Sequence, residues 1–475
     1  MTGIKAAQIL HDNNMDDFII IEGADYVGGR VKHETFAGQT VELGAQWVVP
    51  GYTEIVDLVL REWELETYPM DWDSVVLRDA ENGLAVPDSE ADPSWDKFSD
   101  AIDTIKVVAQ DIVDKGKADM SAKAALRIGG WIAKTPLEKI MEWFSYDFET
   151  GQRSDVTSLL SMAFIEYNED VHIMTDPRGY SAMFDKIAPF LSTPEYVNHT
   201  RLNQRIQRID YDSNNNDGLV RVYCDDGTVY TADYALVTFS LGVLQSDLVE
   251  FTPKLPDWKI EELYQMHMSA YGKIFMKFTE KFWGDEQNIL HVNKRYNFYP
   301  YFINFDAFGG LPADTHILIA NVIGDDAWRI EYQSEEETKR EVETVLQEMY
   351  GLSSPPNATE FRVHTEWLQN PLTMGAYSDW PVEVSQECFP RLQSRVGPWF
   401  FGGEATHEKY NGYVLGALMS GEREAFKILD CMADGDKCPE YVPPPNCDAC
   451  DTAAETVATF ANILMMVVMY LILKN

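Results

Sequence analysis

The chain has 475 residues, of which 45% are hydrophobic and 12% aromatic, and this composition excludes an intrinsically disordered protein. Its length exceeds one ordinary domain and predicts two. A formal net charge of −39 argues against nucleic acid as a partner, because nucleic-acid binding needs basic patches. The same charge fits either a surface kept soluble by its acidity or the attraction of polycations.

The start of the chain predicts part of a dinucleotide-binding unit. Residues 1–10 predict a helix with one apolar face, and residues 18–22 predict a buried strand. Such a unit places a strand and a Gly-x-Gly turn before its helix, and Gly3 fits the third glycine of that pattern. We therefore expect either that the first strand is missing from the chain, which we favour, or that the pyrophosphate turn has diverged. Glu22 ends its strand where a carboxylate accepts ribose hydroxyls, and an ordinary capping Glu is the alternative.

The middle of the chain alternates between helical and strand patterns. Helical spacing of apolar residues covers 94–113 and 136–148, with Ser94 as the predicted N-cap of the first helix. Lys273 lies in a largely apolar strand at 270–278, where a lysine is costly unless it has a partner or extends outward. Further strands are predicted at 208–211, 219–223 and 232–238, and an acidic, solvated helix at 330–350.

Near the end, an apolar strand at 398–401 enters two glycines and Glu404, and a helix begins near Tyr413. Glycine lets a backbone approach a ligand closely, and a helix N-terminus attracts anions. A tightly packed turn is the alternative. Three small residues recur along one side of the helix and admit either a flat ligand or another backbone: Gly412, Gly416 and Gly421.

These segments closely resemble the FAD-dependent amine oxidases, and specifically the polyamine oxidases, over residues 1 to about 440. The resemblance implies an α/β (α+β) fold, in which a Rossmann-like FAD-binding domain is interleaved with a substrate domain of helices and sheet. We expect the FAD-binding domain at 1–70, 195–262 and 368–440, and the substrate domain at 71–194 and 263–367.

The resemblance also implies a set of FAD contacts. Arg30 would reach the pyrophosphate, because a guanidinium matches phosphate oxygens in charge and shape. Glu404 would bind the ribityl chain, and the segment 42–47 would pass beneath the flavin. The implied cofactor-binding residues are Gly3, Glu22, Gly29, Arg30, Gly44, Ala45, Gln46, Trp47, Ile206, Trp367, Gly403, Glu404, Tyr413 and Val414.

Four further roles are implied for the catalytic site. Lys273 would hold a water against flavin N5, and Tyr377 and Tyr413 would be the aromatic walls around an aliphatic amine. Glu149 would be a substrate carboxylate, with a solvated helix-end acid as the alternative; for the two tyrosines the alternative is core packing. Val49 stands where plant-type polyamine oxidases carry a second glutamate, and this departure puts the substrate in question.

The activity implied is FAD-dependent oxidation of amines, most of all the polyamines spermine and spermidine. A hydride equivalent leaves the carbon beside the nitrogen, the imine hydrolyses to an aldehyde and an amine, and dioxygen becomes hydrogen peroxide. We expect no metal. The alternatives are an oxidase of another amine class, and a membrane-anchored relic that no longer binds FAD.

The six cysteines and the tail predict the compartment. Cys224 and Cys388 are expected to be isolated core thiols, whereas the other four cluster at 431–450. The CxxC at 447–450 has no second pair at zinc spacing, so a tail tied by disulfides in an oxidising compartment is favoured. Sequons begin at Asn198 and Asn357 and are compatible with a secreted glycoprotein.

After a Pro/Cys linker at 441–455, residues 456–473 are almost entirely apolar. This run predicts a C-terminal tail anchor or a GPI signal, and a buried helix is the alternative. We expect a membrane-associated protein of the secretory pathway or cell surface, with its catalytic part outside the cell.

Overall fold

The computed structural model describes residues 1–49, 58–163, 171–211, 218–312, 314–382, 384, 388–434 and 438–442. The chain divides into two compact units, Met1–Cys438 and Pro439–Asn475. The predicted apolar segment at 456–473 and the CxxC at 447–450 lie outside the described residues. Among the helices that are described, none is both long enough and apolar enough to cross a membrane.

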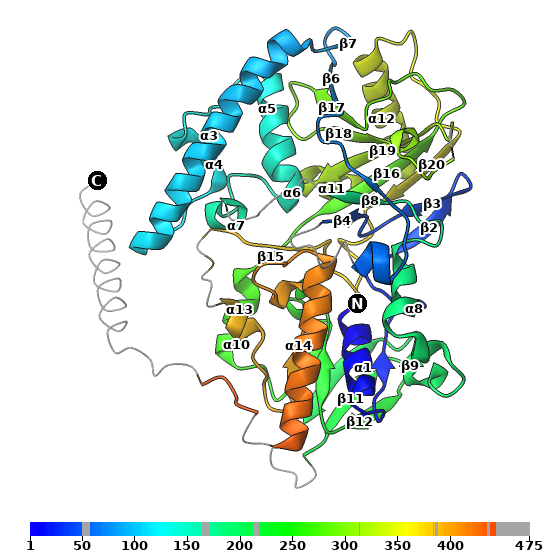
Figure 1. Cartoon of the computed structure of the whole chain (residues 1–475), viewed down its shortest axis with the longest axis vertical. Helices are drawn as coiled ribbons and strands as arrows, with labels where there is room; N and C mark the ends of the chain where they lie inside the picture. Colours follow the sequence, from blue (N-terminus) through cyan, green and yellow to red (C-terminus); the bar gives the residue numbers. More distant parts are fainter. Residues whose placement is uncertain are drawn as a thin grey trace, which may run out of the picture. The chain divides into compact units, whose positions relative to one another are not determined.

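A seven-stranded sheet occupies the upper half of Figure 1 and contains the strand predicted at 270–278. Its order is β20-β16-β19-β18-β17-β6-β7; the β17–β6 pair is parallel and the other pairs are antiparallel. The strands are Glu360–His364 (β20), Tyr271–Lys277 (β16), Ile317–Ile323 (β19), Tyr301–Asn304 (β18), Asn288–Val292 (β17), Val75–Asp79 (β6) and Leu84–Ala85 (β7).

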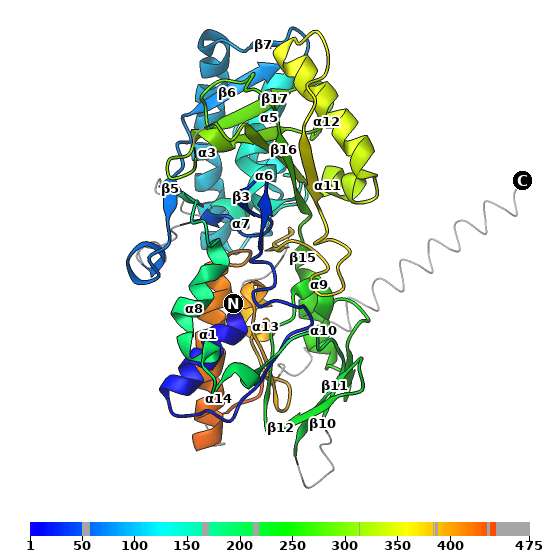
Figure 2. The same cartoon turned by 90° about the vertical axis from the view of Figure 1, so that its right-hand side faces the viewer.

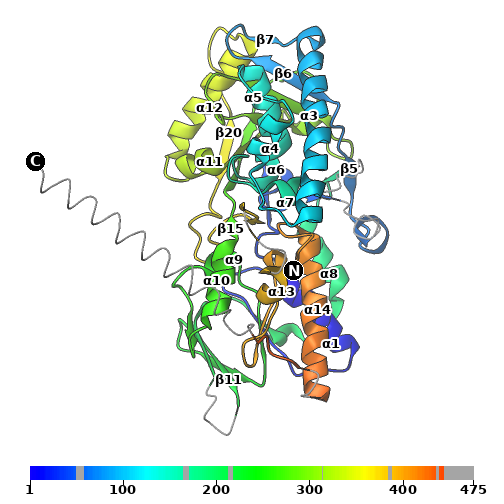
Figure 3. The ribbon, with the colours of Figure 1, turned by 90° about the vertical axis from the view of Figure 1, so that its left-hand side faces the viewer.

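Helices cover both faces of this sheet, as Figures 2 and 3 show from opposite sides. Because side chains alternate along a strand, Phe275 packs into one core with the α3–α5 layer, while its neighbours Ile274 and Met276 pack into another with α11 and α12. The helices are Asp88–Lys115 (α3), Ala122–Ile128 (α4), Pro136–Glu142 (α5), Gly324–Glu331 (α11) and Glu335–Tyr350 (α12).

The start of helix α3 corrects one prediction. Ser94 is not its N-cap, because the helix begins at Asp88 and carries Pro93 inside. A proline inside a helix removes one backbone hydrogen bond, and α3 tolerates this loss at Pro93. Asp88 and Glu90 in the first turn favour the helix dipole, and burial of Ala91 adds an apolar contact ahead of the proline.

The lower part of Figure 1 contains the elements from the two ends of the first unit. The helix predicted at the start is α1 (Thr2–Asp12), and it lies beside α14 (Val414–Ala433). Two short parallel pairs and a four-stranded sheet of order β12-β11-β10-β14 complete this region. Their strands are Ile20–Ile21 (β1), Thr200–Arg201 (β9), Ala235–Val237 (β13), Trp399–Phe401 (β22), Val229–Ala232 (β12), Val220–Cys224 (β11), Ile206–Tyr211 (β10) and Glu250–Thr252 (β14).

Short elements join these regions. The strands are His33–Phe36 (β2), Gln39–Glu42 (β3), Trp47–Val48 (β4), Thr67–Pro69 (β5), His172–Met174 (β8), His267–Met268 (β15) and Ser378–Asp379 (β21). The helices are Phe148–Thr150 (α6), Leu159–Ala163 (α7), Met183–Ile187 (α8), Leu241–Leu244 (α9), Asp257–Gln265 (α10) and Cys388–Leu392 (α13), with π-helical turns at Leu58–Glu62 and Trp143–Asp147.

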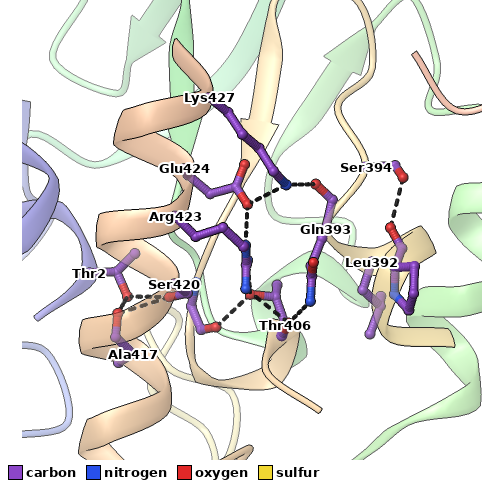
Figure 4. A network of polar contacts seen from close by, with 12 residues as sticks. Thr2, Leu392, Gln393, Ser394, Thr406, Ala417, Ser420, Arg423, Glu424 and Lys427 are labelled. Carbon is purple, nitrogen blue, oxygen red and sulfur yellow. Dashed lines mark hydrogen bonds and ion pairs between the residues drawn. The ribbon is translucent and has the colours of Figure 1, made fainter. Parts of the chain in front are cut away.

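Polar side chains tie α14 to its surroundings, and Figure 4 shows this network. The hydroxyl of Thr2 donates to the carbonyl of Ala417 at 2.9 Å, and the backbone N–H of Gly403 donates to Ser420 Oγ at 3.0 Å. A Cβ added to Gly421 would lie 2.3 Å from the carbonyl oxygen of Thr2. Of the two possibilities left open for this glycine, the structure therefore selects close approach of another backbone.

The cysteines of the first unit agree with their predicted roles. Cys224 and Cys388 are free and buried. Cys431 and Cys438 form a disulfide that closes the end of α14. Both sequon asparagines, Asn198 and Asn357, are exposed.

Candidate functional site

One cavity of about 1160 Å³ lies between the sheet region and the α1–α14 region of the first unit. This volume exceeds the roughly 300–1,000 Å³ of an ordinary small-molecule pocket. Every residue predicted for the site lines it, although these residues come from segments hundreds of positions apart. The predicted lining residues are Gly3, Glu22, Gly29, Arg30, Gly44, Ala45, Gln46, Trp47, Glu149, Ile206, Lys273, Trp367, Tyr377, Gly403, Glu404, Tyr413 and Val414.

The elements of the predicted dinucleotide unit leave space for a ligand backbone. The first turn of α1, with its free N–H groups, opens on the cavity. Gly29 has φ of +59°, and a Cβ there would meet no atom within 4 Å. Gly403 has φ of +127°, and the nearest atom to an added Cβ is 3.7 Å away. The left-handed backbone explains why glycine stands at both positions, and the open space beyond it fits close approach by a large ligand.

Glu404 is the best-partnered acid of the cavity. It follows β22, and one of its oxygens accepts from Arg30 Nη1 at 2.8 Å. The other oxygen accepts from Ser378 Oγ at 2.5 Å and from the backbone N–H of Gly412 at 2.6 Å. Arg30 also donates to the carbonyl of Ala376 at 2.9 Å. Glu404 is only 5% exposed, so these charge-assisted hydrogen bonds are what allow a buried carboxylate here.

Lys273 lies in β16, between β20 and β19, and it lines the cavity. Its side chain is buried and does not extend outward into solvent. It is 2% exposed, and burial lowers its pKa. Its ammonium group donates to the backbone carbonyls of Glu42 and Gly44, each at 2.8 Å, and to Gln46 Oε1 at 2.7 Å. The three protons of the ammonium thus hold the segment 42–46 in place.

Glu149, Tyr377 and Tyr413 come together at another part of the cavity wall. The hydroxyl of Tyr413 donates to the Glu149 carboxylate, and the hydroxyl of Tyr377 donates to the Glu149 carbonyl at 3.3 Å. Burial raises the pKa of Glu149, and the Tyr413 hydrogen bond opposes this rise. The carboxyl faces the cavity and not bulk solvent, which argues against a solvated helix-end acid.

Sequence reasoning missed three polar residues of the lining. Tyr271 donates to Asn321 Oδ1 at 2.7 Å. His364 is 2% exposed, neither of its ring nitrogens has a hydrogen-bond partner among the described residues, and its Cα pairs with that of Lys273 across β16 and β20. Asp379 is 6% exposed. Tyr271 stands two residues before Lys273, and Asp379 two residues after Tyr377, so strand alternation was the available signal.

The cavity fits FAD by its donors as well as by its size. Gln46 Nε2 is a buried donor without a partner among the described residues, and it belongs to a residue of the cavity wall. Arg30 and the first turn of α1 favour an anionic ligand group, such as a pyrophosphate. No cluster of three or more His, Cys, Asp or Glu side chains that could hold a metal occurs in the part of the chain that the structure describes.

Known proteins are similar to this chain in sequence, and solved structures are similar to it in fold. The family model "Flavin containing amine oxidoreductase" matches residues 1–429. Polyamine oxidase 1 of Zea mays is 33% identical over 452 residues, covering 91% of this chain and 89% of that protein. Polyamine oxidase 6 of Oryza sativa subsp. japonica is 31% identical over 450 residues, with the same coverage of 91% and 89%.

Solved structures agree with the fold. Wild-type putrescine oxidase bound to putrescine has a TM-score of 0.72, with 18% sequence identity, and the match covers 90% of this chain and 96% of that one. The predicted α/β amine oxidase fold is therefore confirmed, as is the resemblance on which it was based. On the extent of the family match and on these relatives, the chain belongs to the flavin-containing amine oxidoreductases, enzymes that oxidise amines with FAD as cofactor.

Proposed function

We propose that this enzyme oxidises polyamines, such as spermidine and spermine, to an aldehyde, an amine and hydrogen peroxide. The observation that carries the proposal is Glu149, a residue of the cavity wall whose carboxylate accepts from the Tyr413 hydroxyl and whose backbone carbonyl accepts from the Tyr377 hydroxyl. Two relatives of more than 30% identity carry the name polyamine oxidase and support the same class of substrate. A carboxylate in a cavity wall favours a ligand with an additional positive charge over a simple alkylamine.

In this proposal the protein positions the substrate and keeps its reacting end dry. Tyr377 and Tyr413 lie on either side of an aliphatic chain, where their rings exclude water and favour the neutral form of the reacting nitrogen. Glu149 binds an ammonium group further along the chain. Bound FAD supplies the acceptor for the hydride equivalent and passes the electrons to dioxygen.

We assign the FAD contacts to the predicted residues on the same grounds. Glu22 directly follows β1 at the cavity and would accept the ribose hydroxyls, while Arg30 and the first turn of α1 would hold the pyrophosphate. Lys273 keeps the segment 42–46 in place and, as the sequence predicted, would orient a water beside the flavin. For that second role, its ammonium would have to release one of its present acceptors.

The test of the function is substrate oxidation by the purified, flavin-loaded protein. We expect hydrogen peroxide and oxygen consumption with spermidine or spermine, at kcat/KM values at least about tenfold above those for monoamines. Preference for a monoamine of equal chain length would contradict the polyamine assignment, while leaving the amine oxidase activity intact.

We further propose attachment to the cell surface through residues 456–473. Support comes from the apolar sequence of that segment, the Cys431–Cys438 disulfide, and the exposed sequon residues Asn198 and Asn357. Deleting residue 456 onward should release the protein from the membrane fraction, and treatment with a GPI-specific phospholipase separates a lipid anchor from a helix. A full-length protein found wholly in the soluble fraction would contradict this proposal.

A further inference from the structure

A second buried acid, Asp379, faces the same part of the cavity as Glu149. It ends β21 and is 6% exposed. Side chains alternate along an extended backbone, and the Ser378 hydroxyl is directed at Glu404. Asp379 therefore lies on the opposite side of this segment from Ser378, the side on which the Tyr377 hydroxyl meets the Glu149 carbonyl.

The two carboxyl groups affect each other. Burial raises the pKa of Asp379 to about 8; the backbone N–H of Trp380 opposes the rise, and the charge of Glu149 adds to it. Two carboxylates that share a site cannot both ionise easily unless a cation joins them. His267 is the Cα partner of Asp379 across β15 and β21, but its side chain is exposed and outside the cavity lining, so it does not supply that cation.

Among the buried acids of the cavity wall, Glu404 has a cationic partner in the protein, because it pairs with Arg30. None of the described salt bridges involves Glu149 or Asp379, although both residues line the cavity. A pair of acids without a protein cation, in a cavity walled by tyrosine rings, matches a ligand that brings its own positive charges.

We propose that Asp379 and Glu149 together bind the non-reacting ammonium groups of the substrate, and that Asp379 makes the enzyme selective for di- and polyamines over monoamines. This inference rests on the proposed polyamine oxidase function and assigns part of its specificity to a residue outside the predicted site. It also gives the substrate a second acid beside Glu149, although Val49, another lining residue, is uncharged.

The test is the Asp379→Asn variant of the flavin-loaded enzyme, which keeps the size of the side chain and removes its negative charge. The substrates are spermidine and the monoamine hexylamine, with the inhibition constant of hexylamine in place of its kcat/KM if it is not turned over. We expect kcat/KM for spermidine to fall about 10- to 100-fold, the loss typical of one hydrogen bond to a charged group, and mainly through KM. Hexylamine should be affected less than about twofold, and flavin content should not change.

Asp326→Asn is the matched control, because Asp326 is also 6% exposed and has a raised pKa, but it lies in α11 outside the cavity lining. This variant should leave the ratio of the kcat/KM values for spermidine and hexylamine unchanged. If the ratio of kcat/KM for spermidine to kcat/KM for hexylamine is the same in Asp379→Asn as in the wild type, whether or not both values fall, Asp379 is a structural residue and the inference is wrong. If the wild type itself does not oxidise polyamines, the proposed function fails, and that result appears before any variant is made.

Discussion

The segment Tyr377–Asp379 separates two carboxylate environments that differ in the number of their donors. On one side, Glu404 accepts hydrogen bonds from Arg30, Ser378 and Gly412. On the other side, Glu149 accepts from Tyr413, and burial raises its pKa. Both acids line one cavity, and successive residues of this segment contact them: Tyr377 donates to the Glu149 carbonyl, and Ser378 donates to the Glu404 carboxylate.

The difference teaches how the same residue type can serve two purposes. A buried carboxylate with a guanidinium and two further donors is already satisfied and holds protein segments together. A carboxyl group with a single neutral donor keeps its capacity to bind a cation, because nothing in the protein has neutralised it. The first environment suits the fixed cofactor, and the second suits a substrate that must enter and leave.

Removing the best-partnered acid should have the largest effect. Glu404→Ala leaves the Arg30 guanidinium, the Ser378 hydroxyl and the Gly412 N–H without their acceptor. Leaving a buried charge unpaired costs about 3 kcal/mol or more, which corresponds to a loss of more than about 100-fold in apparent FAD affinity. The ratio of flavin to protein absorbance measures this loss. Glu404→Gln keeps an oxygen acceptor, so its flavin content should lie between that of Glu404→Ala and that of the wild type. Full flavin content in Glu404→Ala would contradict the contrast drawn between Glu404 and Glu149.

Lys273→Met should slow turnover by about tenfold or more while flavin stays bound, the scale expected for a positioned group that handles protons. Stopped-flow experiments can time reduction by the amine and reoxidation by oxygen separately. Lys277→Met is the control on the same strand, because the Lys277 ammonium donates to the Thr315 carbonyl outside the cavity lining. Loss of flavin from Lys273→Met would instead show that the lysine acts mainly by holding the segment 42–46.

The pH dependence of substrate binding should follow Glu149. Its pKa is raised, so the carboxyl is neutral on the acid side of that pKa and cannot pair with an ammonium group. Polyamine kcat/KM should therefore rise with pH as Glu149 ionises, and in Glu149→Gln this rise should weaken, with KM about tenfold higher. Tyr413→Phe removes the hydrogen bond that favours ionisation, so it should move the rise to higher pH. Unchanged pH profiles in both variants would place the titrating group elsewhere.

The smallest expected effect concerns the close contact between α1 and α14, the two helices beside the part of the cavity assigned to FAD. Gly421→Ala forces a Cβ to within 2.3 Å of the Thr2 carbonyl oxygen, a backbone atom that cannot easily move. Such overpacking should lower the free energy of unfolding by about 1–3 kcal/mol, as thermal or denaturant unfolding measures, with kcat little changed. Met419→Ala, at a position on α14 that is 39% exposed, should stay within about 0.5 kcal/mol of the wild type. Equal stability of both variants would mean that α1 shifts to make room.

The prediction of the elements succeeded where periodicity was strong. The strand at 270–278 is β16 and the strand at 398–401 is β22. The acidic helix predicted at 330–350 ends at Tyr350 as predicted, but it begins only at Glu335, because α11 ends at Glu331. The prediction failed at Ser94, because the acidic first turn at Asp88 and Glu90 and the buried Ala91 extend the helix ahead of the apolar spacing that marked its start. Helix boundaries depend on such competing terms more than helix existence does.

The sequence by itself pointed to candidate residues for the site, through glycines at a turn between strand and helix, a lysine in an apolar strand, where an unpartnered charge is costly, and the resemblance to one enzyme family. Only the tertiary structure decided how those residues are partnered. Lys273 and the segment 42–46 are more than two hundred positions apart, as are Glu149 and Asp379, and no local pattern reports such pairs. A carboxyl group's readiness to bind a cation depends on its donors and its burial, and both are set by the fold.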